Sequence, residues 1–225
     1  MKIQQIVSIL AILTMVAICV LPVAAATDDE ATNYYNSAQL LIEDQQYERA
    51  LELLNKVIVS NTTLLGMGDG LMYTYKDRVA LLIDLGRYDE AIVAADQGIA
   101  LYPREPGIWN NKGYAYYNMG KYTEAINAYE KAVTLDPDYL KGWINKGNAL
   151  AKAGRAHEAV GAYETALELD PGNADATAGL EDAEKAAGNN NIFFAIILVI
   201  AAGLVIWYVK FRKPGDEKSA GKEKK

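Results

Sequence analysis

Few side chains in this sequence have the type and spacing that catalysis needs. Over 225 residues there is one histidine, His157, and one cysteine, Cys19, which excludes a Cys/His metal site and a disulfide framework. His157 stands beside Glu158 at the start of an expected helix, where a solvated polar residue explains it better than a general base does. The glycine-rich segment 66–70 lacks the Lys-Ser/Thr pair of a phosphate-binding loop. We therefore expect no enzyme activity, no catalytic residue, no metal and no cofactor.

Two further features concern the surface and its partners. Asn61 opens the sequence Asn-Thr-Thr, which is an acceptor for N-glycosylation, and the sequence leaves open whether it is modified. The formal net charge is −7, and the acidic residues are concentrated in the middle of the chain. Because nucleic-acid binding relies on a basic face that neutralises phosphates, we expect no nucleic acid among the partners.

The N-terminus has the pattern of a secretory signal peptide over residues 1–26. Lys2 is followed by an apolar stretch, by Pro22 and by three alanines, and these small residues favour cleavage after Ala26. An uncleaved anchor helix is the alternative, and the sequence does not decide between the two.

A second apolar stretch covers residues 192–209, which contain no charged side chain. At about 1.5 Å per residue such a helix is roughly 27 Å long, close to the thickness of the hydrocarbon layer of a membrane. Trp207 and Tyr208 stand at its end, and a basic tail, 210–225, follows. The positive charge predicts a cytoplasmic tail, with residues 27–191 outside the cytoplasm. These features predict a single-pass protein of the cell membrane with one C-terminal transmembrane helix.

The sequence between the two apolar stretches repeats itself every 34 residues, the distance from Trp109 to Trp143. The same spacing relates Gly86, Gly120 and Gly154; Pro103, Pro137 and Pro171; Gly113 and Gly147; Ala125 and Ala159; Tyr129 and Tyr163; and Ala132 and Ala166. A period of this length is typical of paired helices that stack on one another, since no single pair can bury both of its faces.

This pattern of Trp, Gly, Tyr, Ala and Pro at fixed offsets resembles the tetratricopeptide repeat family. Lys112 and Lys146 depart from it, because they stand where the family usually has Leu. The resemblance implies an all-α fold, a right-handed α-solenoid of about four helix pairs with a capping helix, followed by the C-terminal transmembrane helix. The expected segments are a signal peptide at 1–26, a solenoid at 27–187 with repeats at about 31–64, 72–105, 106–139 and 140–173 and a cap helix at 174–187, a linker at 188–191, a transmembrane helix at 192–209 and a tail at 210–225.

In this family the first helix of each pair lines a concave groove that binds peptides. Carried onto this chain, the resemblance places in the groove Tyr35, Tyr73, Lys76, Asn110, Tyr114, Tyr117, Asn118, Lys141 and Asn148, with Gln39, Glu43, Asp84, Ile144 and Lys152 beside them. Tyr supplies a large contact area at a low entropic cost, which suits a binding surface. A family subtype has a clamp for C-terminal carboxylates, and here Lys76, Asn111 and Lys141 match it, whereas Ala80 and Asn145 depart from it.

These features together predict a membrane-anchored, extracytoplasmic scaffold or assembly factor that binds an unidentified partner protein or peptide in the groove. The combination is similar to prokaryotic envelope proteins of this family, archaeal ones included. The alternative is a structural component of a cell-surface complex that self-associates as a homo-oligomer. Loss of a partner when the groove is mutated would favour the first function, and oligomers that form without a partner would favour the second.

Overall fold

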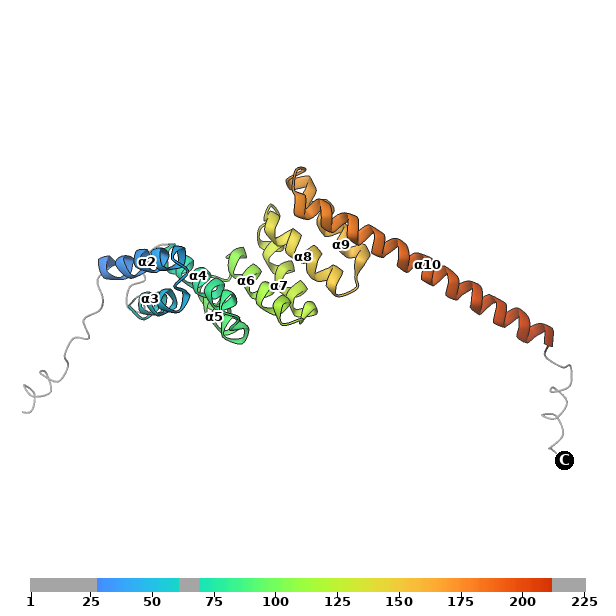
Figure 1. Ribbon diagram of the computed structural model, residues 1–225, viewed down its shortest axis with the longest axis horizontal. Helices are drawn as coiled ribbons and strands as arrows, with labels where there is room; N and C mark the ends of the chain where they lie inside the picture. Colours follow the sequence, from blue (N-terminus) through green and yellow to red (C-terminus); the bar gives the residue numbers. More distant parts are fainter. Residues whose placement is uncertain (1–27, 61–68, 212–225) are drawn as a thin grey trace, which may run out of the picture. The chain divides into compact units, whose positions relative to one another are not determined.

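The computed structural model describes residues 28–60 and 69–211, and the regular elements within these ranges are α-helices (Figure 1). They are α2 (Asp28–Glu43), α3 (Tyr47–Ser60), α4 (Gly70–Asp84), α5 (Tyr88–Leu101), α6 (Pro106–Asn118), α7 (Tyr122–Leu135), α8 (Leu140–Lys152), α9 (Ala156–Leu169) and α10 (Ala174–Phe211). The bounds of α5, α7 and α9 repeat every 34 residues, as do those of α6 and α8, and the all-α repeat fold is confirmed. The predicted signal peptide with its cleavage site after Ala26, the glycosylation acceptor Asn61 and the tail from residue 212 lie outside the described residues.

Three glycines lie in the turns between the two helices of a pair. Gly86, Gly120 and Gly154 have φ angles of 72°, 74° and 75°, in the left-handed region that a residue with a Cβ rarely adopts. In the first pair the corresponding residue is Gln45, with φ of 59°. The turn therefore requires this conformation even where the sequence supplies no glycine.

The described helices form two compact units, divided after Gly120. In the first unit α3 packs against α2 and α4, and α6 packs against α4 and α5. The core of this unit consists of small and aliphatic side chains, among them Ala50, Leu54, Val79, Ala91 and Ile108. The small residues let the helices approach closely, and the aliphatic ones remove apolar area from water.

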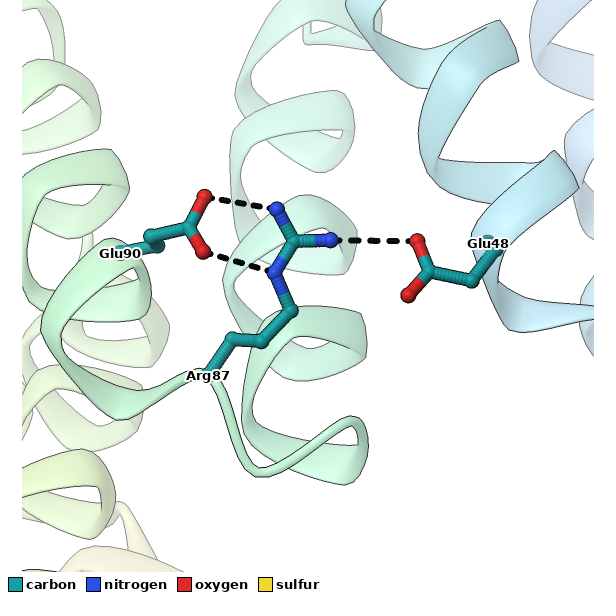
Figure 2. A network of polar contacts seen from close by, with 3 residues as sticks. All are labelled: Glu48, Arg87 and Glu90. Carbon is teal, nitrogen blue, oxygen red and sulfur yellow. Dashed lines mark hydrogen bonds and ion pairs between the residues drawn. The ribbon is translucent and has the colours of Figure 1, made fainter.

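Arg87 joins the first two helix pairs through a fork of ion pairs (Figure 2). Its Nε and one terminal nitrogen donate to the two carboxylate oxygens of Glu90, both at 2.7 Å, and the other terminal nitrogen donates to Glu48 of α3 at 3.1 Å. The hydrogen bonds from Arg87 lower the pKa of Glu90 below its usual value. Because both carboxylates are exposed, the network fixes orientation more than it adds stability.

In the second unit α7 packs against α8, and α9 packs against α8 and α10. The ring of Tyr163 on α9 is 2% exposed and lies against two glycines. A Cβ on Gly147 of α8 would lie 2.7 Å from this ring, and a Cβ on Gly179 of α10 would lie 2.4 Å from it. Both helices can approach α9 so closely because these two residues have no side chain.

Lys112 and Lys146 stand where the resemblance leads us to expect Leu, and each pairs with an acidic residue on the preceding helix. Lys112 Nζ lies 2.5 Å from Asp96 Oδ1, and Lys146 Nζ forms an ion pair with Glu130. The Lys146 ammonium also lies 4.7 Å from the centroid of the Trp143 ring. A lysine stem can cover apolar surface as Leu does while its charged end stays paired.

The last helix, α10, is continuous from Ala174 to Phe211 and includes residues 188–191, where we expected a linker (Figure 1). Its first part packs against α8 and α9. The side chains from Ile196 to Tyr208 are exposed.

Among the described residues, no helix has the length and apolar character that crossing a membrane requires. The prediction of a C-terminal transmembrane helix at 192–209 is therefore wrong. The localisation derived from it, a single-pass protein of the cell membrane with extracytoplasmic repeats and a cytoplasmic C-terminus, is wrong with it.

Candidate functional site

Lys76, a predicted groove residue on α4, has contacts on both α4 and α6. Its ammonium nitrogen lies 4.5 Å from the centroid of the Tyr73 ring, one turn earlier on α4. Its backbone carbonyl accepts a hydrogen bond of 3.2 Å from Asn111 Nδ2 on α6. Its aliphatic stem lies beside Gly107, since a Cβ on that glycine would be 2.9 Å from Lys76 Cδ. The residue is therefore held at its backbone, along its stem and at its charged end.

The Lys76 ammonium forms no ion pair with a carboxylate within residues 28–60 and 69–211. The face of an aromatic ring stabilises a nearby cation by about 0.5–1 kcal/mol at an exposed position, but it does not neutralise the charge. The site can therefore bind an anionic group without first breaking an ion pair.

Tyr114 and Tyr117 form an aromatic surface on α6. Their rings are stacked, with centroids 6.4 Å apart and planes 9° from parallel. Tyr114 is 43% exposed, and so is Tyr73 on α4. Exposed Tyr rings give contact area for a ligand at a low entropic cost, because few torsions are fixed on binding. Asn118 instead donates its side-chain amide to the Tyr114 carbonyl on the same helix, at 2.8 Å.

Tyr35, another predicted groove residue, uses its hydroxyl within the fold. The hydroxyl donates to Asp77 Oδ2 at 2.9 Å, and Gln39 Nε2 donates to the same oxygen at 2.6 Å. Burial, reinforced by the hydrogen bond to Asp77, raises the pKa of Tyr35 well above its usual value. These three side chains tie α2 to α4. Sequence reasoning missed Asp77, because nothing in its spacing marks it before the fold places α2 beside it.

Asn110 is 1% exposed and lies in the interior, although the resemblance places it in the groove. Its Nδ2 donates to Asn111 Oδ1 at 3.4 Å. Asn110 therefore supports Asn111, which in turn binds the Lys76 carbonyl.

In the second unit, the two predicted groove residues of α8 differ from each other. Lys141 is exposed, whereas Asn148 Oδ1 accepts a hydrogen bond of 2.6 Å from the hydroxyl of Tyr163. This bond satisfies the polar atom of a buried ring, so Asn148 has a packing role.

No cluster of side chains in the described part of the chain suits a metal ion. His157, the single histidine, is exposed at the start of α9. The described residues of the first unit present a cation, aromatic rings and amide groups. Such groups bind ligands and do not by themselves catalyse a reaction.

Comparison with known families and sequences gives one clear match. Models of the tetratricopeptide repeat match residues 31–59, 106–139 and 140–173. No curated protein sequence matches the chain.

Solved structures give further matches. The first TPR domain of Spaghetti (RPAP3), bound to the HSP90 peptide SRMEEVD, is 30% identical with a TM-score of 0.51, and the match covers 52% of this chain and 95% of that one. The first TPR domain of human RPAP3 is 29% identical with a TM-score of 0.53, covering 55% and 98%. MamA from Desulfovibrio magneticus RS-1, residues 41 to the end, is 19% identical with a TM-score of 0.60, covering 77% and 98%, a likeness that shows the fold alone.

Proposed function

The chain belongs to the tetratricopeptide repeat family, whose repeats are protein-interaction modules and generally not enzymes, and we propose that its first unit binds a peptide through an anionic group. This group is an acidic side chain or a free C-terminal carboxylate. The observation that carries the proposal is the Lys76 ammonium, which is held over Tyr73 and forms no ion pair with any carboxylate of the described residues.

The neighbouring aromatic surface supports the same conclusion. Tyr114 and Tyr117 on α6 offer apolar area to the rest of a peptide whose carboxylate lies at Lys76. The similar domain of Spaghetti (RPAP3) supports this class of ligand, since it is bound to SRMEEVD, a peptide with two glutamates and a last residue Asp. A charged contact fixes the position of such a ligand, and the rings add contact area.

Binding of labelled SRMEEVD to the full chain, measured by fluorescence anisotropy, tests the proposal. We expect Lys76→Met to weaken binding about tenfold, since a hydrogen bond to a charged group contributes roughly 1.5 kcal/mol. A neutral form of the peptide has Gln in place of both glutamates, Asn in place of Asp and a C-terminal amide. It should bind to the wild-type chain as weakly as SRMEEVD binds to Lys76→Met.

Lys56→Met is the matched control, because the Lys56 ammonium also lies over a tyrosine, 5.6 Å from the Tyr34 ring. It should leave binding unchanged. Equal affinity of the wild-type chain and Lys76→Met would contradict the proposal, and so would a wild-type chain that does not bind the peptide.

The exposed apolar residues 196–208 of α10 favour a second candidate function, self-association as a structural component. Large exposed apolar patches mark interaction sites in proteins. Light scattering of the purified chain separates the two functions. Oligomers that form without peptide and persist in Lys76→Met would favour the second candidate, and a monomer that binds peptide would favour the first.

A further inference from the structure

We infer that Gly107 is a positioning residue for the proposed site: the missing side chain at 107 keeps the Lys76 ammonium over Tyr73, where it receives the anionic group of the peptide. The inference rests on the proposed function and adds a residue that does not itself touch the ligand. Gly107 is buried in the first turn of α6.

The space that a side chain would need at this position is already filled. A Cβ on Gly107 would lie 2.9 Å from Lys76 Cδ and 3.8 Å from Lys76 Cγ. It would also lie 2.9 Å from Glu105 Oε1, the carboxylate oxygen that accepts a hydrogen bond from the Gly107 N–H at 3.3 Å. Both distances of 2.9 Å are too short for a real Cβ contact, so Lys76 and Glu105 would have to move.

The backbone does not explain the glycine. Gly86, Gly120 and Gly154 are the glycines with positive φ in the described part of the chain, and Gly107 is not among them. The period of 34 residues places Tyr73 and Lys141 at the corresponding positions, so a side chain is accepted there in other copies. The reason for a glycine at 107 is therefore space, because the stem of Lys76 and the carboxylate of Glu105 already fill it.

The atoms that would be displaced are the flexible ends of two side chains, so the fold has a way to accept alanine at 107. The stem of Lys76, however, would have to follow a different path. The backbone of Lys76 would stay in place, because Asn111 holds its carbonyl. The ammonium would leave Tyr73 and face the ligand from a different position.

A double-mutant cycle of Gly107→Ala and Lys76→Ala in the full chain tests the inference, with SRMEEVD as the peptide and anisotropy as the measurement. We expect Gly107→Ala to weaken binding about five- to tenfold, the range for a displaced charged contact. In the Lys76→Ala background, Gly107→Ala should change the affinity less than twofold. Gly161→Ala, a helical glycine with open space around its Cβ, is the control and should leave affinity unchanged.

An NMR measurement reads the position of Lys76 directly. Nuclear Overhauser contacts between the Lys76 Hε protons and the Tyr73 ring should be present in the wild-type chain and in Gly161→Ala, and should be lost in Gly107→Ala. A purely structural role of Gly107 would leave these contacts intact.

The outcomes separate the inference from the proposed function. If Lys76→Ala weakens binding and Gly107→Ala does not, Gly107 has no positioning role and the proposed function stands. If Lys76→Ala binds like the wild-type chain, both are wrong. If Gly107→Ala does not fold, circular dichroism of the double variant, Gly107→Ala with Lys76→Ala, tests the inference instead. The inference requires that removing the Lys76 stem restores folding, and a double variant that stays unfolded overturns it.

Discussion

The indole nitrogen of Trp143 donates a hydrogen bond of 2.8 Å to the carbonyl oxygen of Pro137, just after the end of α7. Trp109 makes the same bond to Pro103, at 3.1 Å, just after the end of α5. Both tryptophans are only partly buried. Each also satisfies a carbonyl of the loop between two helices, which has no helical partner.

Trp143→Phe keeps most of the ring and removes this bond. We expect the free energy of unfolding to fall by about 1 kcal/mol, the usual contribution of one hydrogen bond. Urea denaturation followed by circular dichroism measures the change, and Trp109→Phe should give a similar value. An unchanged midpoint in both variants would mean that the bond contributes nothing to the free energy of unfolding.

The double change Tyr114→Ala with Tyr117→Ala removes the aromatic surface of α6. We expect peptide affinity to fall about thirtyfold, since truncating aromatic anchors typically costs ~2 kcal/mol or more. Helicity should stay nearly the same, because Tyr114 is 43% exposed. Unfolding of the double variant would show instead that these rings are part of the core, and a folded variant with full affinity would exclude them from the site.

Gln45 adopts the turn conformation that glycine adopts in the other pairs. The backbone bond from Gln46 N–H to Leu41 O, 2.8 Å, matches the bond from Arg87 N–H to Leu82 O in the next pair, also 2.8 Å. Gln45→Gly should therefore stabilise the fold by about 1 kcal/mol, the cost of a left-handed conformation for a residue with a Cβ.

Gly86→Ala tests the same turn in the opposite direction. A Cβ there would meet no atom within 4 Å, so only the φ of 72° opposes the change. We expect a loss of about 1 kcal/mol in the free energy of unfolding. Thermal denaturation that shows the same sign for both variants would contradict the assignment of the turn.

Gly179→Ala adds one methyl group against the buried ring of Tyr163. The ring is 2% exposed and also lies against Gly147, so we expect a loss of about 1–3 kcal/mol from overpacking, although alanine is the better helix former. Gly161→Ala on α9 meets no atom within 4 Å and should stabilise the chain by about 1 kcal/mol. Chemical denaturation measures the change in the free energy of unfolding, which should have opposite signs in the two variants. Stabilisation by Gly179→Ala would mean that α10 does not pack this closely on α9.

Arg87 holds the pKa of Glu90 below its usual value through two hydrogen bonds. A carboxyl group with a lowered pKa stabilises the fold above its unfolded pKa, and this contribution is lost as the pH falls through its folded pKa. Arg87→Gln should therefore raise the pKa of Glu90. The variant should then lose less stability than the wild-type chain when the pH falls below the usual pKa of Glu.

Titration of the side-chain carboxyl carbons by ¹³C NMR measures this shift. Arg155→Gln is the control, because Arg155 lowers the pKa of Glu158 in the same way and has no bond to Glu90. If the pKa of Glu90 is the same with and without Arg87, the network drawn in Figure 2 is not formed in solution.

The helix pairs could be predicted from the sequence because the residues that end helices repeat with the same period. Gly86, Gly120 and Gly154 have nearly the same φ, which only glycine adopts at little cost. The groove itself stays a prediction. A position in the period tells which helix face a residue is on, but not which neighbours use its polar atoms. The hydroxyl of Tyr35 donates a hydrogen bond to Asp77, and the hydroxyl of Tyr163 donates one to the amide oxygen of Asn148.

The end of the cap helix could not be predicted from residue types. Gly188 and the asparagines after it disfavour a helix by at most about 1 kcal/mol each, and propensity is a weak guide when the preceding turns are already packed. The helix therefore continues into the apolar residues. The hydropathy of 192–209 predicted a membrane span, whereas among the described residues no helix meets that requirement.

The ion pairs of Lys112 and Lys146 have a consequence for how such a chain can lengthen. Each lysine pairs with an acid sixteen residues earlier, Asp96 in one case and Glu130 in the other. The segment 106–139 thus contains one lysine, Lys112, that pairs with the segment before it and one glutamate, Glu130, that pairs with the segment after it. If the segment were duplicated in tandem, the new joint would place a lysine sixteen residues after a glutamate, as at Lys146. The array can therefore gain a repeat by gene duplication without leaving an unpaired charge at the new joint.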